Sequence, residues 1–334
     1  PHSDVASGRF SAAEFAADLF NVHHGQGSSE YTDPVQFFDR TYMTDGLEKL
    51  LRQAVRRIGG DTGSPPVIDL QTTFGGGKTH SMISLYHLFS GVAVADFPQE
   101  IQDLVHSENV DALPAVSKAV VVGTRFSPVL AQQKPDGCEV GTIWGEIAWQ
   151  LGGKEAFDSV AEADFNPANP GDHLRAVIEA AAPCLILIDE WVAYAAQLFG
   201  ERDMRGGDFG TQFYFAQSLT EIVNSVPGAL LVVSLPASVD AEGAETEAQV
   251  GGQHAHEALR KLRDAVGRTK DAWHPASAEE GFEIVRRRLF QDPDPENLKH
   301  IKATAKAFSE FYNKEAAEFP PEAKEREFVS KLER

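Results

Sequence analysis

The sequence predicts an α/β fold in which a parallel sheet is flanked by helices on both faces. Four short segments predict strands, at residues 66–72, 119–124, 184–189 and 229–235, and the last three carry apolar runs typical of strands buried on both sides. Segments with helical spacing of apolar residues separate or follow these runs, at 141–151, 171–182, 209–226 and 254–266. Three glycines join the first run to a further helix at 81–89. Strands that alternate with helices in this way indicate a doubly wound sheet.

The first 60 residues precede this alternation and predict a helical extension. Apolar residues recur at helical spacing through residues 11–24 and again through 44–58. Between these segments, Asp33 and Pro34 supply a helix cap followed by a proline at the first helical position. We therefore expect residues 1–60 to form a helical extension before the sheet-forming part of the chain.

Composition and charge limit the classes of protein to which the chain can belong. The 334 residues carry a formal net charge of −20, and 42% of them are hydrophobic, which is sufficient for a normal core. Such an acidic chain repels the phosphate backbone of nucleic acids, so DNA binding is not favoured. No apolar run approaches the roughly 18 residues that span a membrane. Cys138 and Cys184 stand in no metal-ligand spacing, and we expect a cytoplasmic protein.

The segment DLQTTFGGGKTH, residues 69–80, predicts a phosphate-binding loop. Its place between a strand and a helix suits that role, because glycine amides can turn toward an anion that also lies at the helix N-terminus. Lys78 is expected to reach the β- and γ-phosphate oxygens, and the Thr79 hydroxyl to bind Mg²⁺. The predicted nucleotide-binding residues are Phe74, Gly75, Gly76, Gly77, Lys78, Thr79 and His80. Thr72 stands where the general motif has its first glycine, so an ordinary flexible loop is the alternative.

An acidic pair follows the third predicted strand and completes the expected site. Asp189 and Glu190 come directly after the apolar residues of CLILIDE. Asp189 is expected to hold Mg²⁺, and Glu190 to polarise the attacking water. The alternative is a strand end whose acidic residues only face solvent. Together with the glycine loop, the pair predicts binding and hydrolysis of ATP with magnesium as the cofactor.

Further polar residues carry weaker expectations. Ser234 ends the fourth strand, where it is expected to contact the γ-phosphate or the water, although a serine can simply end a strand. Arg268 follows the helix at 254–266 and is a candidate arginine finger for a neighbouring subunit, although arginine also suits a helix C-terminus. Arg125 and the Arg286–Arg288 run are more typical of solvated surfaces. The histidine pairs at 23/24 and 254/256 have no companion ligands at zinc spacing.

The order of these motifs resembles the AAA+ branch of the P-loop NTPases. More closely, the chain is similar to large ATPases of bacterial anti-phage islands, including the phage-growth-limitation Y-type ATPase of BREX systems. The resemblance rests on GRF-x₄-FAADL, YTDPVQFFDRTYMT, LQTTFGGGKTHSM, TIWGEIAWQLGG, LIDEWVAYAAQL and SAEEGFEIVRRRLF, at residues 8–19, 31–44, 70–82, 142–153, 187–198 and 277–290.

The resemblance implies three parts and a set of partners. The parts are a helical extension at 1–60, an ATPase core at 61–275 and the start of a helical lid at 276–334. The core is expected to carry insertions at 91–117 and 125–170. Because such proteins are usually much longer, and this chain has no initiator Met, we expect a piece of a larger protein. Homo-oligomers and other phage-defence proteins are the expected partners, with no membrane involved.

Three functions remain open at this point. The leading hypothesis is an ATPase that couples Mg-ATP hydrolysis to conformational change or assembly of a defence complex. The first alternative is a scaffold gated by nucleotide that barely turns over. The second is a DNA translocase or helicase, which the charge of −20 disfavours.

Overall fold

The computed structural model describes residues 1–7, 17–72, 77–201, 204–236, 253–267, 272–273, 280–291 and 294–314. The chain divides into two compact units. The larger unit comprises Phe10–Ile284 and contains the sheet, and the smaller one comprises Pro1–Arg9 and Val285–Arg334. Most of the N-terminal extension therefore belongs to the same unit as the sheet.

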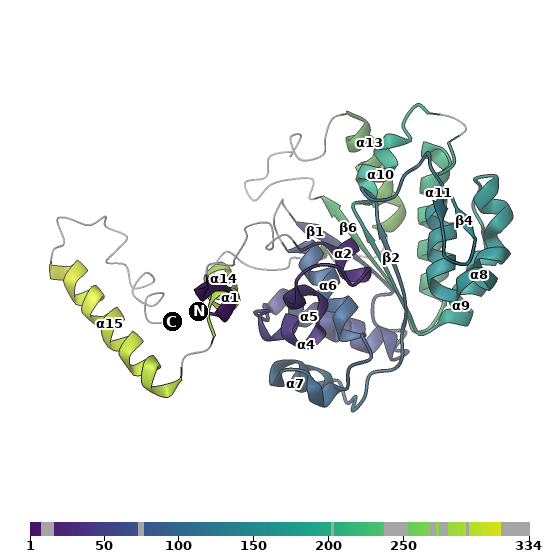
Figure 1. Ribbon diagram of the computed structural model, residues 1–334. Coiled ribbons are helices and arrows are strands. Elements are labelled where there is room, and N and C mark those ends of the chain that lie inside the picture. The colour runs from purple at the N-terminus through teal and green to yellow at the C-terminus, as the bar shows by residue number, and fades with distance from the viewer. Residues whose placement is uncertain are drawn as a thin grey trace. The chain divides into compact units, whose positions relative to one another are not determined.

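A parallel sheet of five strands forms the centre of the larger unit. Its strand order is β2-β5-β6-β1-β7, and every pair is parallel (Figure 1). The strands are β1 (Val67–Thr72), β2 (Ser117–Val122), β5 (Cys184–Asp189), β6 (Ala229–Pro236) and β7 (Ala272–Trp273). The four predicted strands are confirmed, and with them the α/β class. The additional β7 spans only two residues, too few for a periodic pattern.

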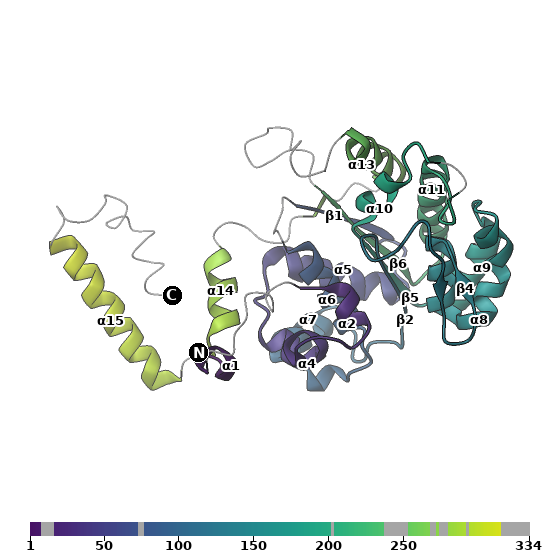
Figure 2. The ribbon, with the colours of Figure 1, turned by 45° about the horizontal axis from the view of Figure 1, so that its top comes forward.

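Helices cover both faces of this sheet (Figure 2). One face packs against α5 (Asp45–Ile58), α6 (Lys78–Leu88) and α7 (Gln99–Ser107). The other face packs against α8 (Ile143–Phe165), α9 (Asp172–Ala181), α10 (Trp191–Gln197), α11 (Phe209–Ser225) and α13 (Gln253–Val266). Successive strand residues alternate between the two cores, so that Ile68 and Leu70 face α6 whereas Val67 faces the opposite layer. This two-sided burial explains the continuous apolar runs.

Three short helices precede α5, namely α2 (Leu19–His23), α3 (Ser29–Thr32) and α4 (Pro34–Asp39). The Asp33 side chain accepts hydrogen bonds from the amides of Val35 and Gln36, and Pro34 occupies the first turn of α4, which confirms the predicted cap. Thr44 caps α5 in the same way. The helix predicted at 11–24 is described only as α2, because residues 8–16 lie outside the described part of the chain.

The segments between the strands contain elements that the sequence pattern did not predict. The segment 91–117 holds a 3₁₀ turn, η2 (Val94–Asp96), and α7. The segment 125–170 holds a two-stranded hairpin, β3 (Gln132–Gln133) and β4 (Glu139–Val140), followed by α8. The helix predicted at 141–151 forms the first part of α8. Gly152 and Gly153 have non-helical backbone angles and kink the chain, and a second helical segment then runs to Phe165. Gly153 has a φ of 63°, which glycine adopts without steric cost.

A buried arginine ties α5 to the edge of the sheet where β6 begins. Arg57 is only 1% exposed. Its guanidinium donates to the carbonyl oxygens of Ala229 (2.9 Å), Val223 (2.8 Å) and Val226 (2.8 Å). The cation is therefore held by backbone dipoles on three sides, and α5 is joined to the loop between α11 and β6.

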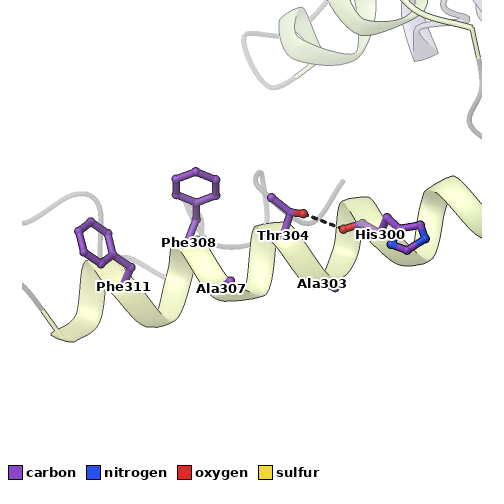
Figure 3. A pocket seen from close by; sticks show the side chains of 6 residues that line it. All are labelled: His300, Ala303, Thr304, Ala307, Phe308 and Phe311. Atoms are coloured by element: carbon purple, nitrogen blue, oxygen red, sulfur yellow. Dashed lines mark hydrogen bonds between the residues drawn. The ribbon is translucent and has the colours of Figure 1, made fainter.

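The smaller unit is built from α1 (Ser3–Ala6), the end of α14 (Gly281–Leu289) and α15 (Pro295–Lys314). The His2 amide donates to the Leu289 carbonyl at 3.0 Å. Along α15 lies a shallow hollow of about 420 Å³, whose lining comes from this one helix: His300, Ala303, Thr304, Ala307, Phe308 and Phe311 (Figure 3). Among the described residues, no helix has both the length and the apolar character needed to cross a membrane.

Candidate functional site

The helix α6 begins directly after the glycine run. Its cap, Gly77, adopts the left-handed conformation with φ 81° and ψ 13°. The amide and the hydroxyl of Ser81 both donate to the Gly77 carbonyl, at 2.9 and 2.8 Å. Glycine favours this conformation because it lacks a Cβ. Lys78 and Thr79 therefore form the first turn of α6, where the helix dipole attracts anions. The predicted residues Phe74, Gly75 and Gly76 lie outside the described residues.

The structure brings Thr79 next to Asp189, although the two are 110 positions apart in the sequence. The Thr79 hydroxyl donates to Oδ2 of Asp189 at 3.1 Å. The Ser234 hydroxyl donates to the other carboxylate oxygen, Oδ1. Both Asp189 and Ser234 are buried, at the carboxyl ends of β5 and β6. Because β6 lies between β1 and β5, Ser234 lies between the strand that precedes the glycine run and the strand that ends in Asp189.

Glu190 adopts a backbone conformation that is rare for a residue with a side chain. Its φ of 57° and ψ of 30° fall in the left-handed region, immediately before α10. The Glu190 amide donates to Oδ1 of Asp189 at 3.0 Å and to the Ser234 hydroxyl at 3.3 Å. Two polar side chains thus hold one strained peptide in place. Strain of this kind is concentrated at functional sites and costs of order 1–3 kcal/mol.

A glycine on the neighbouring strand makes this conformation possible. The Gly123 amide donates to the Asp189 carbonyl at 2.8 Å. A Cβ at position 123 would lie 2.2 Å from the carbonyl oxygen of Glu190 and 3.0 Å from Cβ of Tyr194. Any side chain at this position would collide with the Glu190 peptide. Sequence reasoning missed Gly123, although a glycine at the end of an apolar strand is the signal of such a close approach.

Lys78 lies in the field of three carboxylates. Burial lowers the pKa of the Lys78 ammonium, while the charges of Asp189, Glu190 and Asp69 oppose that shift. Burial raises the pKa of the Glu190 carboxyl, as does the charge of Asp189, and Lys78 acts in the opposite direction. A carboxylate with a raised pKa is a better proton acceptor. Asp189 and Lys78 therefore act in opposite directions on the pKa of Glu190, the general-base candidate.

Two further predicted residues make contacts with the N-terminal helices. The Nε2 atom of His80 lies 3.1 Å from the Thr41 hydroxyl, and its ring centroid lies 4.7 Å from that of Phe37. Burial lowers the pKa of His80 to about 4. Arg125 forms an ion pair with Asp18 at 3.2 Å. Arg268, the candidate arginine finger, lies outside the described residues.

The oxygen atoms of Asp189 and Thr79 suit a magnesium ion. Mg²⁺ prefers hard oxygen ligands and is usually bound by one or two carboxylates together with waters and substrate phosphates. Among the described residues, no group of three or more His, Cys, Asp or Glu side chains is arranged to hold a metal ion by itself. One buried carboxylate beside one hydroxyl therefore fits a cation that arrives with a phosphate ligand.

Comparison with known proteins gives two findings. No curated protein matches the chain. A protein-family model described as the DUF499 N-terminal domain matches residues 2–272.

Proposed function

The chain belongs to the DUF499 N-terminal domain family, and from that premise we propose that this domain binds ATP with magnesium and hydrolyses it. The matched range ends at the first residue of β7 and contains Lys78, Thr79, Asp189, Glu190 and Ser234. All five residues of the proposed site therefore lie within the matched domain, and the proposed core is a P-loop NTPase of the AAA+ kind.

One observation carries the proposal. The Thr79 hydroxyl and the Asp189 carboxylate are in hydrogen-bond contact at 3.1 Å, at the N-terminus of α6. The hydroxyl that follows the glycine–lysine pair thus contacts an aspartate that is buried at the end of β5. Together they make the ligand pair expected for a metal that accompanies a triphosphate.

Binding follows from charge and backbone geometry. The Lys78 ammonium donates to phosphate oxygens, and the N-terminal end of α6 adds the partial positive charge of its dipole. Thr79 and Asp189 would hold the magnesium ion, which would neutralise charge on the phosphates. Ser234 keeps the Asp189 carboxylate oriented through its hydrogen bond to Oδ1.

Hydrolysis is assigned to Glu190. Its carboxylate, with a raised pKa, accepts a proton from the attacking water, and its backbone is fixed by Asp189 and Ser234. The left-handed backbone of Glu190 supports turnover over simple nucleotide gating, because a protein that only bound ATP would gain nothing from retaining this strain.

The wider role follows the resemblance seen in the sequence. We place this ATPase in bacterial phage defence, where it couples its nucleotide state to conformational change or to assembly of a defence complex. The hairpin β3–β4 and the helices α7 and α8, which lie in the two segments expected as insertions, are available to contact other subunits or defence proteins.

The test compares ATP binding and turnover in matched variants. Lys78→Ala is expected to weaken Mg-ATP binding by about 10–100-fold, because one charge-assisted phosphate contact is lost. Lys154→Ala is the control, since Lys154 is an exposed lysine on α8 that pairs with Asp158. Undiminished Mg-ATP affinity in Lys78→Ala would overturn the proposal.

Glu190→Gln separates hydrolysis from gating. We expect it to retain Mg-ATP binding while kcat falls by about 10²–10⁴-fold. Equally slow turnover in the wild type and in Glu190→Gln would identify a nucleotide-gated scaffold. Turnover stimulated by duplex DNA in a salt-dependent way would identify a translocase.

A further inference from the structure

A buried carboxylate that the proposed mechanism does not use lies in the strand before the glycine run. Asp69 of β1 is 6% exposed and points toward the layer that contains α13, since its neighbours Ile68 and Leu70 face the opposite core. Its Oδ2 atom accepts a hydrogen bond from Gln71 at 2.5 Å. Within the described part of the chain, its Oδ1 atom has no hydrogen-bond partner. An unsatisfied buried carboxylate oxygen is costly and needs an explanation.

An arginine from α13 lies in the same region. Arg263 donates through Nη2 to the carbonyl of Pro236, the last residue of β6. Pro236 is in register with Thr72, the last residue of β1, so Arg263 reaches the edge of the sheet where the glycine run begins. Its Nε atom is also buried without a partner among the described residues. Asp69 and Arg263 therefore each keep unused hydrogen-bonding capacity beside the phosphate loop.

Electrostatic coupling joins these groups to Lys78. Burial raises the pKa of Asp69 to about 6, and the Gln71 hydrogen bond and the charges of Arg263 and Lys78 oppose that rise. Arg263 comes from α13 on one face of the sheet, and Lys78 from α6 on the other. One carboxylate thus attracts cations that lie on both sides of the strand end.

We propose that Asp69 is a positioning residue of the nucleotide site, where it competes with the bound phosphates for the cations of Lys78 and Arg263. This inference rests on the proposed function. In the free protein, Asp69 draws the two cations toward the end of β1. When a triphosphate binds, both cations turn toward it, and the carboxylate left behind repels the phosphates and limits how tightly they are held.

The proposal predicts opposite effects on binding and turnover. Asp69→Asn keeps the shape and the Gln71 contact but removes the negative charge, so Mg-ATP affinity should rise by about five- to tenfold. The same change removes one of the three carboxylate charges that act on Lys78, so the ammonium is less well positioned and kcat should fall by about tenfold. A merely structural role for Asp69 would instead weaken binding and stability together.

Arg263→Gln provides the reciprocal variant. Its amide can still donate to the Pro236 carbonyl, but its charge is gone, so Mg-ATP affinity should fall by about tenfold. The double variant Asp69→Asn/Arg263→Gln should return to within about threefold of the wild-type affinity, because both opposing charges are absent. Cancellation of this kind marks a charge pair that acts on a shared ligand.

The experiment measures the Kd of Mg-ATP by calorimetry, the kcat, and the thermal midpoint for each variant. Glu146→Gln is the matched control, because Glu146 is a carboxylate 5% exposed on α8 that pairs with Lys134, away from β1. It should lower the thermal midpoint without changing the Kd. If Asp69→Asn does not fold, the Arg263→Gln variant alone tests the inference. A Kd for Mg-ATP in Arg263→Gln within twofold of the wild-type value would then overturn it.

The remaining outcomes separate this inference from the proposed function. Weaker Mg-ATP binding in Asp69→Asn, or affinity changes of the same sign in both single variants, would overturn the inference alone. If the wild type binds Mg-ATP, Lys78→Ala does not, and Asp69→Asn equals the wild type, the proposed function stands and the inference fails. If the wild type does not bind Mg-ATP, both fail.

Discussion

Replacing Gly123 with alanine should disable Glu190 without abolishing nucleotide binding. The added Cβ would lie 2.2 Å from the Glu190 carbonyl oxygen and 2.8 Å from its carbonyl carbon. Non-bonded heavy atoms rest at roughly 3.5 Å, so the Glu190 peptide or the end of β2 has to move by about 1 Å. Neither contact partner is a flexible side-chain end, so backbone must yield. Overpacking of this kind lowers the free energy of unfolding by about 1–3 kcal/mol.

The catalytic effect should be larger than the effect on stability. A displacement of about 1 Å at a catalytic group costs on the order of 10²-fold in rate. We therefore expect kcat for Mg-ATP hydrolysis to fall about 100-fold in Gly123→Ala. The Kd for Mg-ATP should stay within about threefold of the wild type, because Lys78 and Thr79 lie on α6 and do not contact Gly123. Steady-state hydrolysis, calorimetric binding and urea unfolding measure the three quantities.

Gly281→Ala is the matched control, because a Cβ at that glycine meets nothing within 4 Å. It should leave hydrolysis and the Kd unchanged. A Gly123→Ala protein that unfolds at the wild-type urea midpoint and hydrolyses ATP within about threefold of the wild-type rate would refute the reasoning. Such a result would mean that the left-handed peptide of Glu190 does not depend on the close approach of β2.

Three more predictions concern the scaffold around the site. Arg57→Leu should lower the free energy of unfolding in urea by about 3–5 kcal/mol, because three buried carbonyls lose their donor, whereas a change of less than 1 kcal/mol would contradict the anchoring role. Asp164→Asn should also lower the urea midpoint, because the buried Asp164 carboxylate accepts hydrogen bonds from the amides of Gly141 and Thr142 and pairs with Arg205 at 2.8 Å. An unchanged midpoint would show that the neutral side-chain amide of asparagine stabilises this region as well as the carboxylate does. Burial lowers the pKa of three histidines, His23, His80 and His87, to about 4. The free energy of unfolding should therefore fall as the pH drops from about 6.5 to about 4, because the unfolded chain binds protons at these histidines before the folded protein does. Urea midpoints measured at several pH values test this, and a midpoint that does not change with pH would exclude it.

Much of the fold was predictable because four strands are buried on both faces and therefore appear as apolar runs. The two-residue β7 was not, since its existence depends on pairing with Asp69 and Leu70 rather than on its own composition. The second helical segment of α8, after Gly152 and Gly153, was not predicted either. The two glycines do interrupt the helix, as glycines commonly do, and the segment that follows packs Phe157 and Val160 into the core.

The candidate site likewise has one part that the sequence predicts and one part that depends on the fold. Proximity of Thr79 and Asp189 follows from local patterns, because parallel strands bring their carboxyl ends to one edge of a sheet. The roles of Gly123, Asp69 and Arg263 depend on which strands and helices are neighbours. A glycine after an apolar strand signals a close approach, but the local sequence does not say which backbone approaches it. Arg57 was hidden because an arginine in an amphipathic helix normally belongs to the solvated face.

The contacts of His80 and His87 set a limit on how the domain can be shortened for experiments. His80 lies against Thr41 and Phe37, and Nε2 of His87 lies 2.6 Å from the Tyr31 carbonyl. A truncation that began at residue 61 would expose both imidazoles and the aromatic surface beside them, on the very helix that starts with Lys78. Loss of ATP binding in so short a protein would then report a damaged helix rather than a missing nucleotide pocket. Studies of the isolated domain should therefore keep the helices that precede residue 61.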